Sequence, residues 1–199
     1  MDPARAAVTV TWSSMEGETM EAQSALEVAL EDTGAIIRGV GPDALTRSTP
    51  CAEWDVRDLL NHLVGQLWAF EARLAGTEPR HDAPPGGLPG TDLVGDDPAA
   101  AFDAVAGKVL EASRAQGAQE RAGLACGAYT TETVVHGWDL ARATDQRIPF
   151  EDDLARWCLD FVRQGLTDDN RAPAFGERRQ PPPDATVVDE LVAFAGRTP

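Results

Sequence analysis

Two histidines and one glutamate in this sequence have the types and spacing of metal ligands. Glu132 and His136 lie four residues apart in a stretch with the pattern of a helix, so both side chains fall on one face of that helix. His62 lies on an earlier predicted helix and adds a second imidazole. Two imidazoles and a carboxylate can hold a divalent cation while one coordination position stays open. The three residues are therefore our candidate metal site.

The same side chains also have purely structural interpretations. The chain contains 33 acidic residues, so a carboxylate four positions before a histidine is common by chance. His62 can hydrogen-bond Asp58 one helical turn earlier, and Glu132 with His136 can serve only to stabilise their helix. Asp139, three residues after His136, can either orient a ligand imidazole or remain a solvated charge. Spacing alone leaves these alternatives open.

Aromatic and sulfur-containing residues flank the candidate site in the sequence. Trp54, Trp68 and Trp138 are expected in the core or in pocket walls, and Cys126 is expected as a buried, inert thiol. His81, the third histidine, falls in a Pro/Gly-rich stretch and is expected to contact solvent. None of these residues is expected to be a metal ligand.

The composition describes one globular domain with a small-molecule or protein partner. The 199 residues, 43% of them hydrophobic, are enough for a single core, which we place in residues 18–199. Residues 1–17 show no sustained helical period and are predicted to be a disordered leader. A net charge of -16, with Lys108 the one lysine, argues against nucleic-acid binding, which requires clustered basic side chains. Small molecules, or proteins including a second copy of this chain in a homodimer, are the expected partners.

Cysteine usage and hydropathy indicate a cytoplasmic protein. Cys51, Cys126 and Cys158 form no Cys-x-x-Cys pair, which argues against a disulfide framework and a thiolate zinc site and fits a reducing compartment. No stretch has the length and apolar character of a membrane span, and the N-terminus lacks the pattern of a signal peptide. We therefore expect a soluble chain that has no membrane partner.

Hydrophobic periodicity predicts helices along most of the chain. The capping pair Asp55 and Asp58 begins the clearest of them, which has a continuous apolar stripe. Thr131 is predicted to cap the helix that carries the later two candidate ligands. No alternating strand pattern is present, so we predict an all-α bundle with peripheral short helices and a long Pro/Gly loop over residues 76–97, a candidate lid. The predicted helices cover residues 18–40, 55–74, 98–116, 131–144, 151–166 and 186–195.

Three segments carry a family resemblance: TPCAEWDVRDLLNHLVG over residues 49–65, ETVVHGWDLARAT over 132–144, and LVAFAGRTP over 191–199. In order and spacing they resemble actinobacterial metal-binding proteins related to the N-terminal domain of mycothiol-dependent maleylpyruvate isomerase, within the DinB-like superfamily. The resemblance implies a DinB-like four-helix bundle. It also implies that a histidine of the second helix and a Glu-x-x-x-His motif of a later helix hold a divalent metal, usually zinc. In this sequence those positions are occupied by the candidate ligands: His62, Glu132 and His136.

The resemblance also implies a class of reaction. Enzymes of the family use low-molecular-weight thiols, typically mycothiol. The implied function is a divalent-metal-dependent thiol S-transferase or thiol-assisted isomerase that acts on a small molecule through the metal at His62, Glu132 and His136. Mycothiol is then a cosubstrate, and the metal is Zn²⁺ or another divalent ion such as Ni²⁺ or Fe²⁺. Two alternatives stay open: a metal-dependent cyclase or hydrolase that uses no thiol, and a non-catalytic metal- or ligand-binding module.

Overall fold

A computed structural model gives the fold of the chain for residues 20–51, 54–78, 91–116, 120–171 and 175–199. The predicted leader over residues 1–17, the histidine His81 and the central part of the predicted 76–97 loop lie outside these residues.

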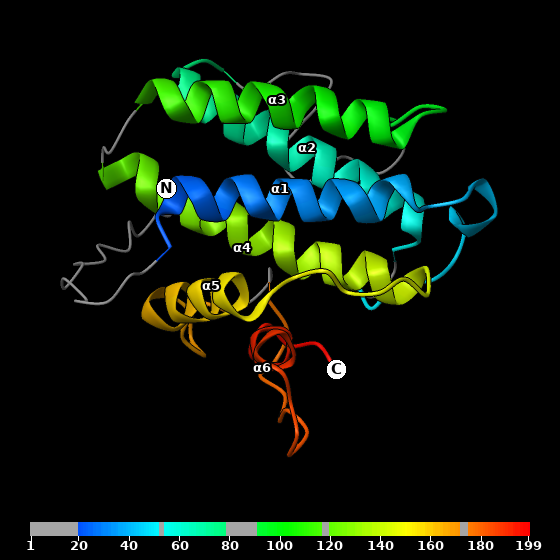
Figure 1. Cartoon of the computed structure of the whole chain (residues 1–199), viewed down its shortest axis with the longest axis vertical. Coiled ribbons are helices and arrows are strands. Elements are labelled where there is room, and N and C mark those ends of the chain that lie inside the picture. Colours follow the sequence, from blue (N-terminus) through cyan, green and yellow to red (C-terminus); the bar gives the residue numbers. More distant parts are fainter. Residues whose placement is uncertain (1–19, 52–53, 79–90, 117–119, 172–174) are drawn as a thin grey trace, which may run out of the picture.

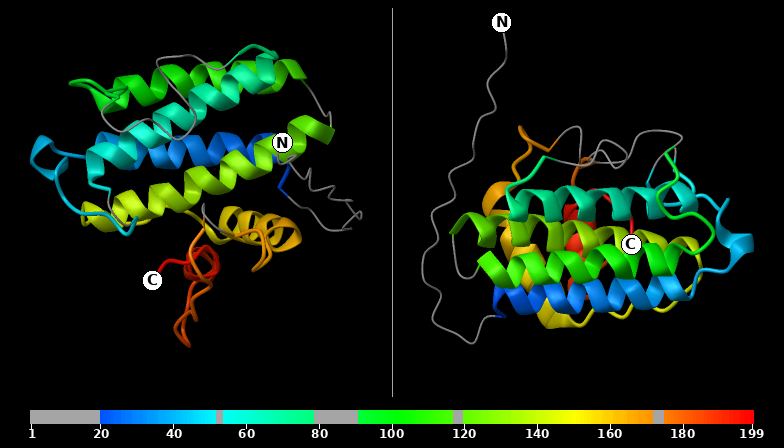
Figure 2. Two further views of the ribbon diagram at one scale, coloured as in Figure 1. Left: turned by 180° about the vertical axis from the view of Figure 1, so that it is seen from behind. Right: turned by 90° about the horizontal axis from the view of Figure 1, so that it is seen from above.

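Four long helices form a bundle, and two shorter helices cover one side of it (Figure 1). In chain order, the elements are α1 Ala22–Arg38, the 3₁₀ helix η1 Pro42–Ala44, α2 Val56–Ala75, α3 Pro98–Gln116, α4 Glu120–Ala143, α5 Asp152–Gly165 and α6 Val187–Phe194. α1 and α2 each pack against both α3 and α4, so the four long helices surround one core. α5 packs on α4 and α6 packs on α5, as the views from behind and above show (Figure 2). The described ranges contain no strand, only an isolated bridge between Ser48 and Asp55. The predicted all-α, DinB-like bundle is confirmed.

The helix of the later candidate ligands is longer than predicted. α4 begins at Glu120, so the prediction that Thr131 caps this helix is wrong. Thr131 instead lies within α4 and is only 2% exposed. The first turns of α4 consist largely of small residues, which form no clear apolar stripe in the sequence. Small residues are needed there because a Cβ at Gly127 would collide with the Phe161 ring of α5.

The predicted pair of aspartates fixes the start of α2. The Asp55 carboxylate accepts a hydrogen bond from the Asp58 backbone N–H at 2.9 Å, and the Asp58 carboxylate accepts one from the Asp55 N–H at 3.3 Å. This capping box satisfies N–H groups that would otherwise lack partners at the helix start. Beyond the last residue of α2, Gly76 adopts φ +68°, a left-handed conformation that glycine accepts readily. The helix so bounded presents His62 to α4.

A glycine lets α1 approach α4 closely beside the candidate ligand His136. A Cβ at Gly137 would lie 2.7 Å from both Phe150 Cζ and Thr33 Oγ1, which is too close without a shift of the neighbours. The fully buried Thr33 also donates a hydrogen bond across this interface, to the Thr133 carbonyl at 3.3 Å. The turn of α4 that carries the candidate ligands is therefore fixed by its packing on α1.

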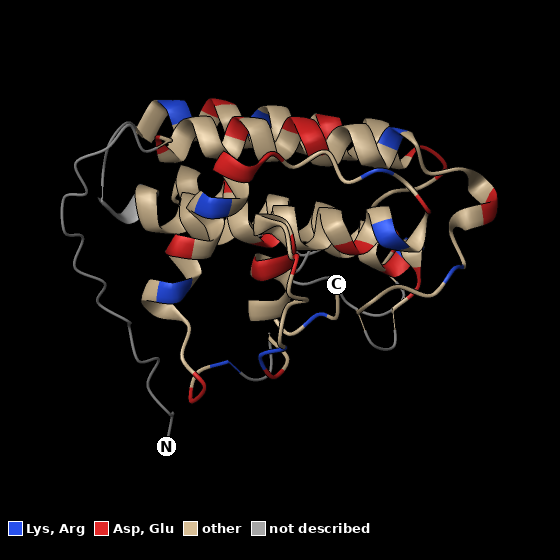
Figure 3. Cartoon of the chain, turned by 60° about the horizontal axis from the view of Figure 1, so that its bottom comes forward, with Lys and Arg blue, Asp and Glu red and all other residues tan. Residues whose placement is uncertain are grey.

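Acidic and basic residues lie near one another on the helices (Figure 3). Arg38 Nη1 and Asp103 Oδ1, for example, are 3.1 Å apart in an exposed ion pair between α1 and α3. Exposed pairs of this kind each contribute little to stability. Among the described residues, no helix is both long and apolar enough to cross a membrane.

Candidate metal centre

The packing of α2 on α4 brings the three predicted ligands together. His62 Nε2 lies 3.0 Å from Glu132 Oε1, and the rings of His62 and His136 meet edge to face with centroids 4.8 Å apart. One donor atom from each of the three side chains lies within 4.8 Å of the others. Zinc ligands lie about 2.0–2.2 Å from the ion, so donors this near one another need only small side-chain shifts to share it.

These residues make contacts between helices as well as within them. Asp58 takes part in the capping box of α2, and His62 contacts Glu132 of α4. Glu132 reaches across to His62 on the neighbouring helix, so it does more than stabilise α4. The three side chains therefore meet between two helices.

The two imidazoles of the group are more enclosed than the Glu132 side chain. The Trp54 ring lies against both imidazoles, with centroids 4.6 Å from His62 and 6.1 Å from His136. His62 and His136 are 8% and 9% exposed, whereas the side chain of Glu132 is 27% exposed. Gln66 Nε2 donates a hydrogen bond of 2.6 Å to Glu132 Oε1 and fixes this carboxylate. Glu132 is therefore the most exposed of the three side chains.

The pKa values of the group suit cation binding. Burial raises the pKa of Glu132, but the hydrogen bond from His62 and the interactions with both imidazoles outweigh it, so the pKa lies below its ordinary value of 4.5. Burial lowers the pKa of His136 below its ordinary value of 6.5, and the contact with Asp139 opposes this only in part. At neutral pH, Glu132 is ionised and His136 is neutral. These are the protonation states in which the two side chains can ligate a metal.

Asp139 is a partner of His136, not a solvated charge. It is fully buried, and its Oδ2 lies 3.1 Å from His136 Nδ1. Arg197, beyond the end of α6, donates to the same carboxylate from Nη2 at 2.9 Å and from Nε at 3.3 Å. Burial raises the pKa of Asp139, but the hydrogen bond to His136 and the charge of Arg197 outweigh it and hold the pKa below 3.8. Asp139 is therefore an ionised acceptor.

The contact with Asp139 determines which nitrogen of His136 is left for a cation. A carboxylate only accepts hydrogen bonds, so a neutral His136 must carry its proton on Nδ1. Its Nε2 then has a free lone pair. Metal-bound histidines commonly use their second nitrogen in this way, with a carboxylate that fixes the tautomer and the ring orientation.

A second group of potential ligands shares His136, but the negative charge in this group is already balanced by Arg197. Cys51, His136 and Asp139 lie close together, with Cys51 Sγ 3.1 Å from Asp139 Oδ2 and 3.6 Å from His136 Nδ1. The Arg197 guanidinium supplies the positive charge here, since its Nη2 is also 3.6 Å from the sulfur. Burial and the negative charge of Asp139 raise the pKa of Cys51 to about 12, so the thiol stays protonated. This group is the weaker candidate for a metal.

Three further residues surround the centre that the sequence did not predict there. Gln66 follows His62 by one helical turn, a spacing that could have placed it on the same face. Cys51 and Arg197 are brought in from other parts of the chain and carry no local signal. By contrast, Trp138 and Cys126 lie in the core as predicted, 1% and 4% exposed.

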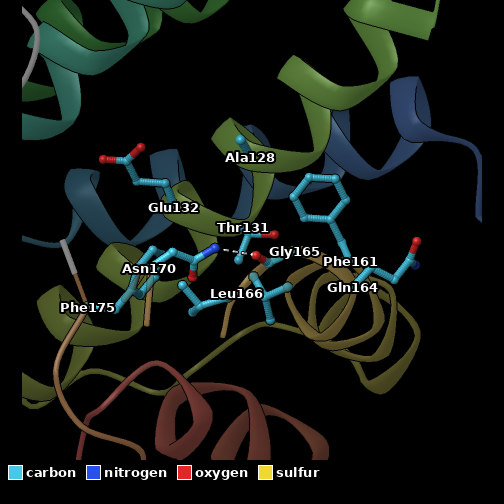
Figure 4. Close-up of a pocket in the computed structure, with 10 residues that line it drawn as sticks. Ala128, Thr131, Glu132, Phe161, Gln164, Gly165, Leu166, Asn170 and Phe175 are labelled. Atoms are coloured by element: carbon cyan, nitrogen blue, oxygen red, sulfur yellow. Dashed lines mark hydrogen bonds between the residues drawn. The ribbon is translucent and has the colours of Figure 1, made fainter. Parts of the chain in front are cut away.

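A cavity of about 270 Å³ borders the centre at Glu132. It lies between α4, α5 and the segment after α5, and most of its wall is apolar (Figure 4). The Glu132 carboxylate points away from Phe161 and Leu166, so the cavity meets the stem of this side chain (Figure 4). The wall is formed by Ala128, Thr131, Glu132, Phe161, Val162, Gln164, Gly165, Leu166, Asn170 and Phe175.

The sequence pattern of the mycothiol maleylpyruvate isomerase N-terminal domain matches residues 26–141, which include all three candidate ligands. The chain belongs to this family. The chain is also similar to uncharacterized proteins from two strains of Mycobacterium tuberculosis. Each is 31% identical over 188 residues, which cover 90% of this chain and 99% of the relative. No solved structure matches the chain.

Proposed function

We propose that His62, Glu132 and His136 bind one divalent metal ion, zinc in the first instance and Ni²⁺ or Fe²⁺ as alternatives. The observation that carries this proposal is the convergence of one donor atom from each side chain within 4.8 Å. The donor set fits such an ion, because neutral imidazoles and a carboxylate are common zinc ligands and the carboxylate offsets part of the charge. Three protein ligands leave a coordination position for a small molecule.

Residues around the three ligands would support the chemistry of the ion. A divalent ion bound there supplies Lewis acidity, which lowers the pKa of a thiol or water in the open position. Asp139 orients His136 through Nδ1, and Gln66 fixes one oxygen of Glu132. Trp54 shields the imidazole side from water.

We propose further that the protein is an enzyme, a mycothiol-type thiol S-transferase or thiol-assisted isomerase. The mycothiol relationship of its family supports the thiol, and the apolar cavity beside Glu132 supports a substrate with an apolar body. In the transfer, the thiolate sulfur forms a C–S bond with an electrophilic carbon. The electron pair released at the electrophile takes up the proton that the thiol lost. Mycothiol is the proposed cosubstrate.

We place this reaction in the cytoplasm, with small molecules as its partners. The cysteines Cys51, Cys126 and Cys158 are free thiols, which suits a reducing compartment. The net charge of -16 disfavours a nucleic-acid partner, because phosphate contacts require clustered basic side chains.

Metal content tests the first part of the proposal. Protein purified without added metal should carry about one zinc ion per chain in elemental analysis, the stoichiometry of a single-ion site. His62→Ala and His136→Ala should carry little. Asp103→Asn, which removes an exposed carboxylate from the α1–α3 ion pair, is the control and should keep the metal. A metal-free wild-type protein that also fails to take up added zinc would remove the proposal.

Thiol consumption tests the second part. We expect the zinc-loaded protein to consume mycothiol in the presence of at least one epoxide, haloarene or enone. A chelator should abolish this activity reversibly while the helical circular-dichroism signal remains. Turnover of a small molecule without thiol would instead assign the cyclase or hydrolase function. Bound zinc without any turnover would assign the non-catalytic module.

A further inference from the structure

We propose that Arg197 is a positioning residue for the metal centre. Through Asp139 it holds His136 in the tautomer and orientation that direct Nε2 to the ion. This inference rests on the proposed metal-binding function. It makes metal affinity depend on a residue that follows α6 and that belongs to none of the helices carrying the ligands.

The contacts form a continuous chain from Arg197 to the imidazole. Arg197 Nη2 and Nε donate to Asp139 at 2.9 and 3.3 Å, and Asp139 Oδ2 accepts from His136 Nδ1 at 3.1 Å. The Asp139 side chain is fully buried, and that of Arg197 is 11% exposed. Charged hydrogen bonds in such a buried place are strong and directional, so the position of the guanidinium defines the position of the carboxylate.

The backbone after α6 fixes Arg197 independently of Asp139. Gly196 adopts φ +93° and turns the chain back toward the bundle. The Arg197 backbone N–H donates to the Val192 carbonyl at 2.9 Å, and its Nη1 donates to the Ala195 carbonyl at 3.0 Å. The guanidinium is therefore held in place by the end of α6 as well as by the carboxylate.

Without Arg197, Asp139 would lose its strongest partner. The remaining donors would be His136 Nδ1 and the weakly donating thiol of Cys51, 3.1 Å from Oδ2. A buried carboxylate with so few donors is free to shift, and the imidazole that depends on it loses its fixed orientation. Asp139 is the outer partner of the candidate ligand His136, and removing such a partner typically lowers metal affinity about 10–100-fold, which sets the upper bound for the loss of Arg197.

The experiment measures zinc affinity of the full-length protein by competition with a chelator. Arg197→Met keeps much of the side-chain volume and should weaken zinc binding about tenfold, the lower end of the 10–100-fold loss typical of removing a direct partner of a ligand. Arg197→Lys keeps the charge but loses the forked geometry, so its affinity should lie between those of Arg197→Met and the wild type. Arg38→Met removes the arginine of the exposed pair with Asp103 and should leave the affinity unchanged.

A second measurement reads the tautomer directly. In the zinc-free wild type at neutral pH, long-range ¹H–¹⁵N NMR correlations of the imidazoles should assign the His136 proton to Nδ1. In Arg197→Met, or in Arg197→Lys if the first variant does not fold, the His136 signals should shift toward a mixture of tautomers. A structural role of Arg197 alone would change the melting temperature but would leave the tautomer intact.

The outcomes separate this inference from the proposed function. If the wild type binds zinc and both Arg197 variants bind it equally well with an unchanged tautomer, the positioning role is refuted while the metal site stands. If the wild type binds no zinc, the metal site is refuted, and an unchanged tautomer in the Arg197 variants would refute the positioning role as well.

Discussion

His62 and Glu132 are 70 residues apart in the chain, yet His62 Nε2 lies 3.0 Å from Glu132 Oε1 at the contact of α2 with α4. The two helices therefore hold an imidazole and a carboxylate opposite each other. Gln66 holds the same carboxylate oxygen, and Asp139 holds His136 at the other side of the group. Because these partners already hold the candidate ligand side chains in place, metal binding would require little further ordering of them.

The negative charge of Glu132 should be essential to metal binding. Glu132→Gln keeps the size of the side chain but removes the charge that offsets a divalent cation. We expect zinc affinity in chelator competition to fall by more than about 100-fold, the upper end of the loss caused by removing an outer partner. Glu111→Gln changes an exposed glutamate of α3 and serves as the control. Equal affinities of the two variants would exclude Glu132 as a ligand.

The turn at Gly196 should tolerate no other residue without a loss of stability. Its φ of +93° is unfavourable for residues with a Cβ, and a Cβ there would lie 2.7 Å from Gly176 Cα. Gly196→Ala should lower the free energy of unfolding by about 1–3 kcal/mol. The variant should also bind zinc more weakly, because Arg197 follows directly. Urea unfolding and chelator competition measure the two effects.

Gly107→Ala is the matched control for that substitution. Gly107 lies exposed within α3, and a Cβ there has open space. Alanine is the better helix former, so the free energy of unfolding of this variant should rise by about 0.5–1 kcal/mol. Its zinc affinity should not change. If the two variants have equal free energies of unfolding, the turn after α6 is not constrained.

The cavity beside Glu132 should select the apolar part of the substrate. Ala128 lies at its wall on an exposed position of α4, so Ala128→Leu can narrow the cavity without disturbing the core. With a bulky apolar electrophile, we expect KM in the thiol-consumption assay to rise about tenfold. This corresponds to a loss of about 1.4 kcal/mol in binding free energy. Zinc content should not change. Ala104→Leu on exposed α3 is the control, and an identical KM in both variants would contradict this assignment.

Acid should destabilise the zinc-free protein in two separate pH windows. The pKa of folded His136 lies below its ordinary value of 6.5, so the unfolded chain takes up this proton first. Its contribution to stability is complete above pH 6.5 and is lost as the pH falls from there through the folded pKa. The pKa values of Glu132 and Asp139 lie below 4.5 and 3.8, so their contributions are lost only in the lower window.

Urea midpoints measured from pH 8 to pH 3 check this dependence. His136→Gln should remove much of the loss of stability in the upper window. It should also make the loss in the lower window smaller, because His136 helps to lower the pKa values of Glu132 and Asp139. A wild-type midpoint that is constant between pH 7 and pH 5 would contradict the neutral, buried state of His136.

The sequence by itself determined most of the helical architecture. Periodic apolar residues and the Asp55–Asp58 capping box are local signals, and the structure reproduces both. The four-residue spacing of Glu132 and His136 likewise fixes both side chains on one face, because it follows from the helical repeat alone. Where the sequence is rich in small residues the local signal fails, and the start of α4 at Glu120 was missed for that reason.

Only the tertiary structure decided what surrounds the candidate ligands. His62 faces Glu132 because α2 packs on α4, and no pattern within either helix states this. Arg197 reaches Asp139 across 58 residues because Gly196 turns the chain behind α6. The periodicity of a sequence indicates which face of a helix is apolar. Which other helix packs against that face depends on the packing of all the helices together. For this reason the ligand types could be named from the sequence, but the partners that orient them could not.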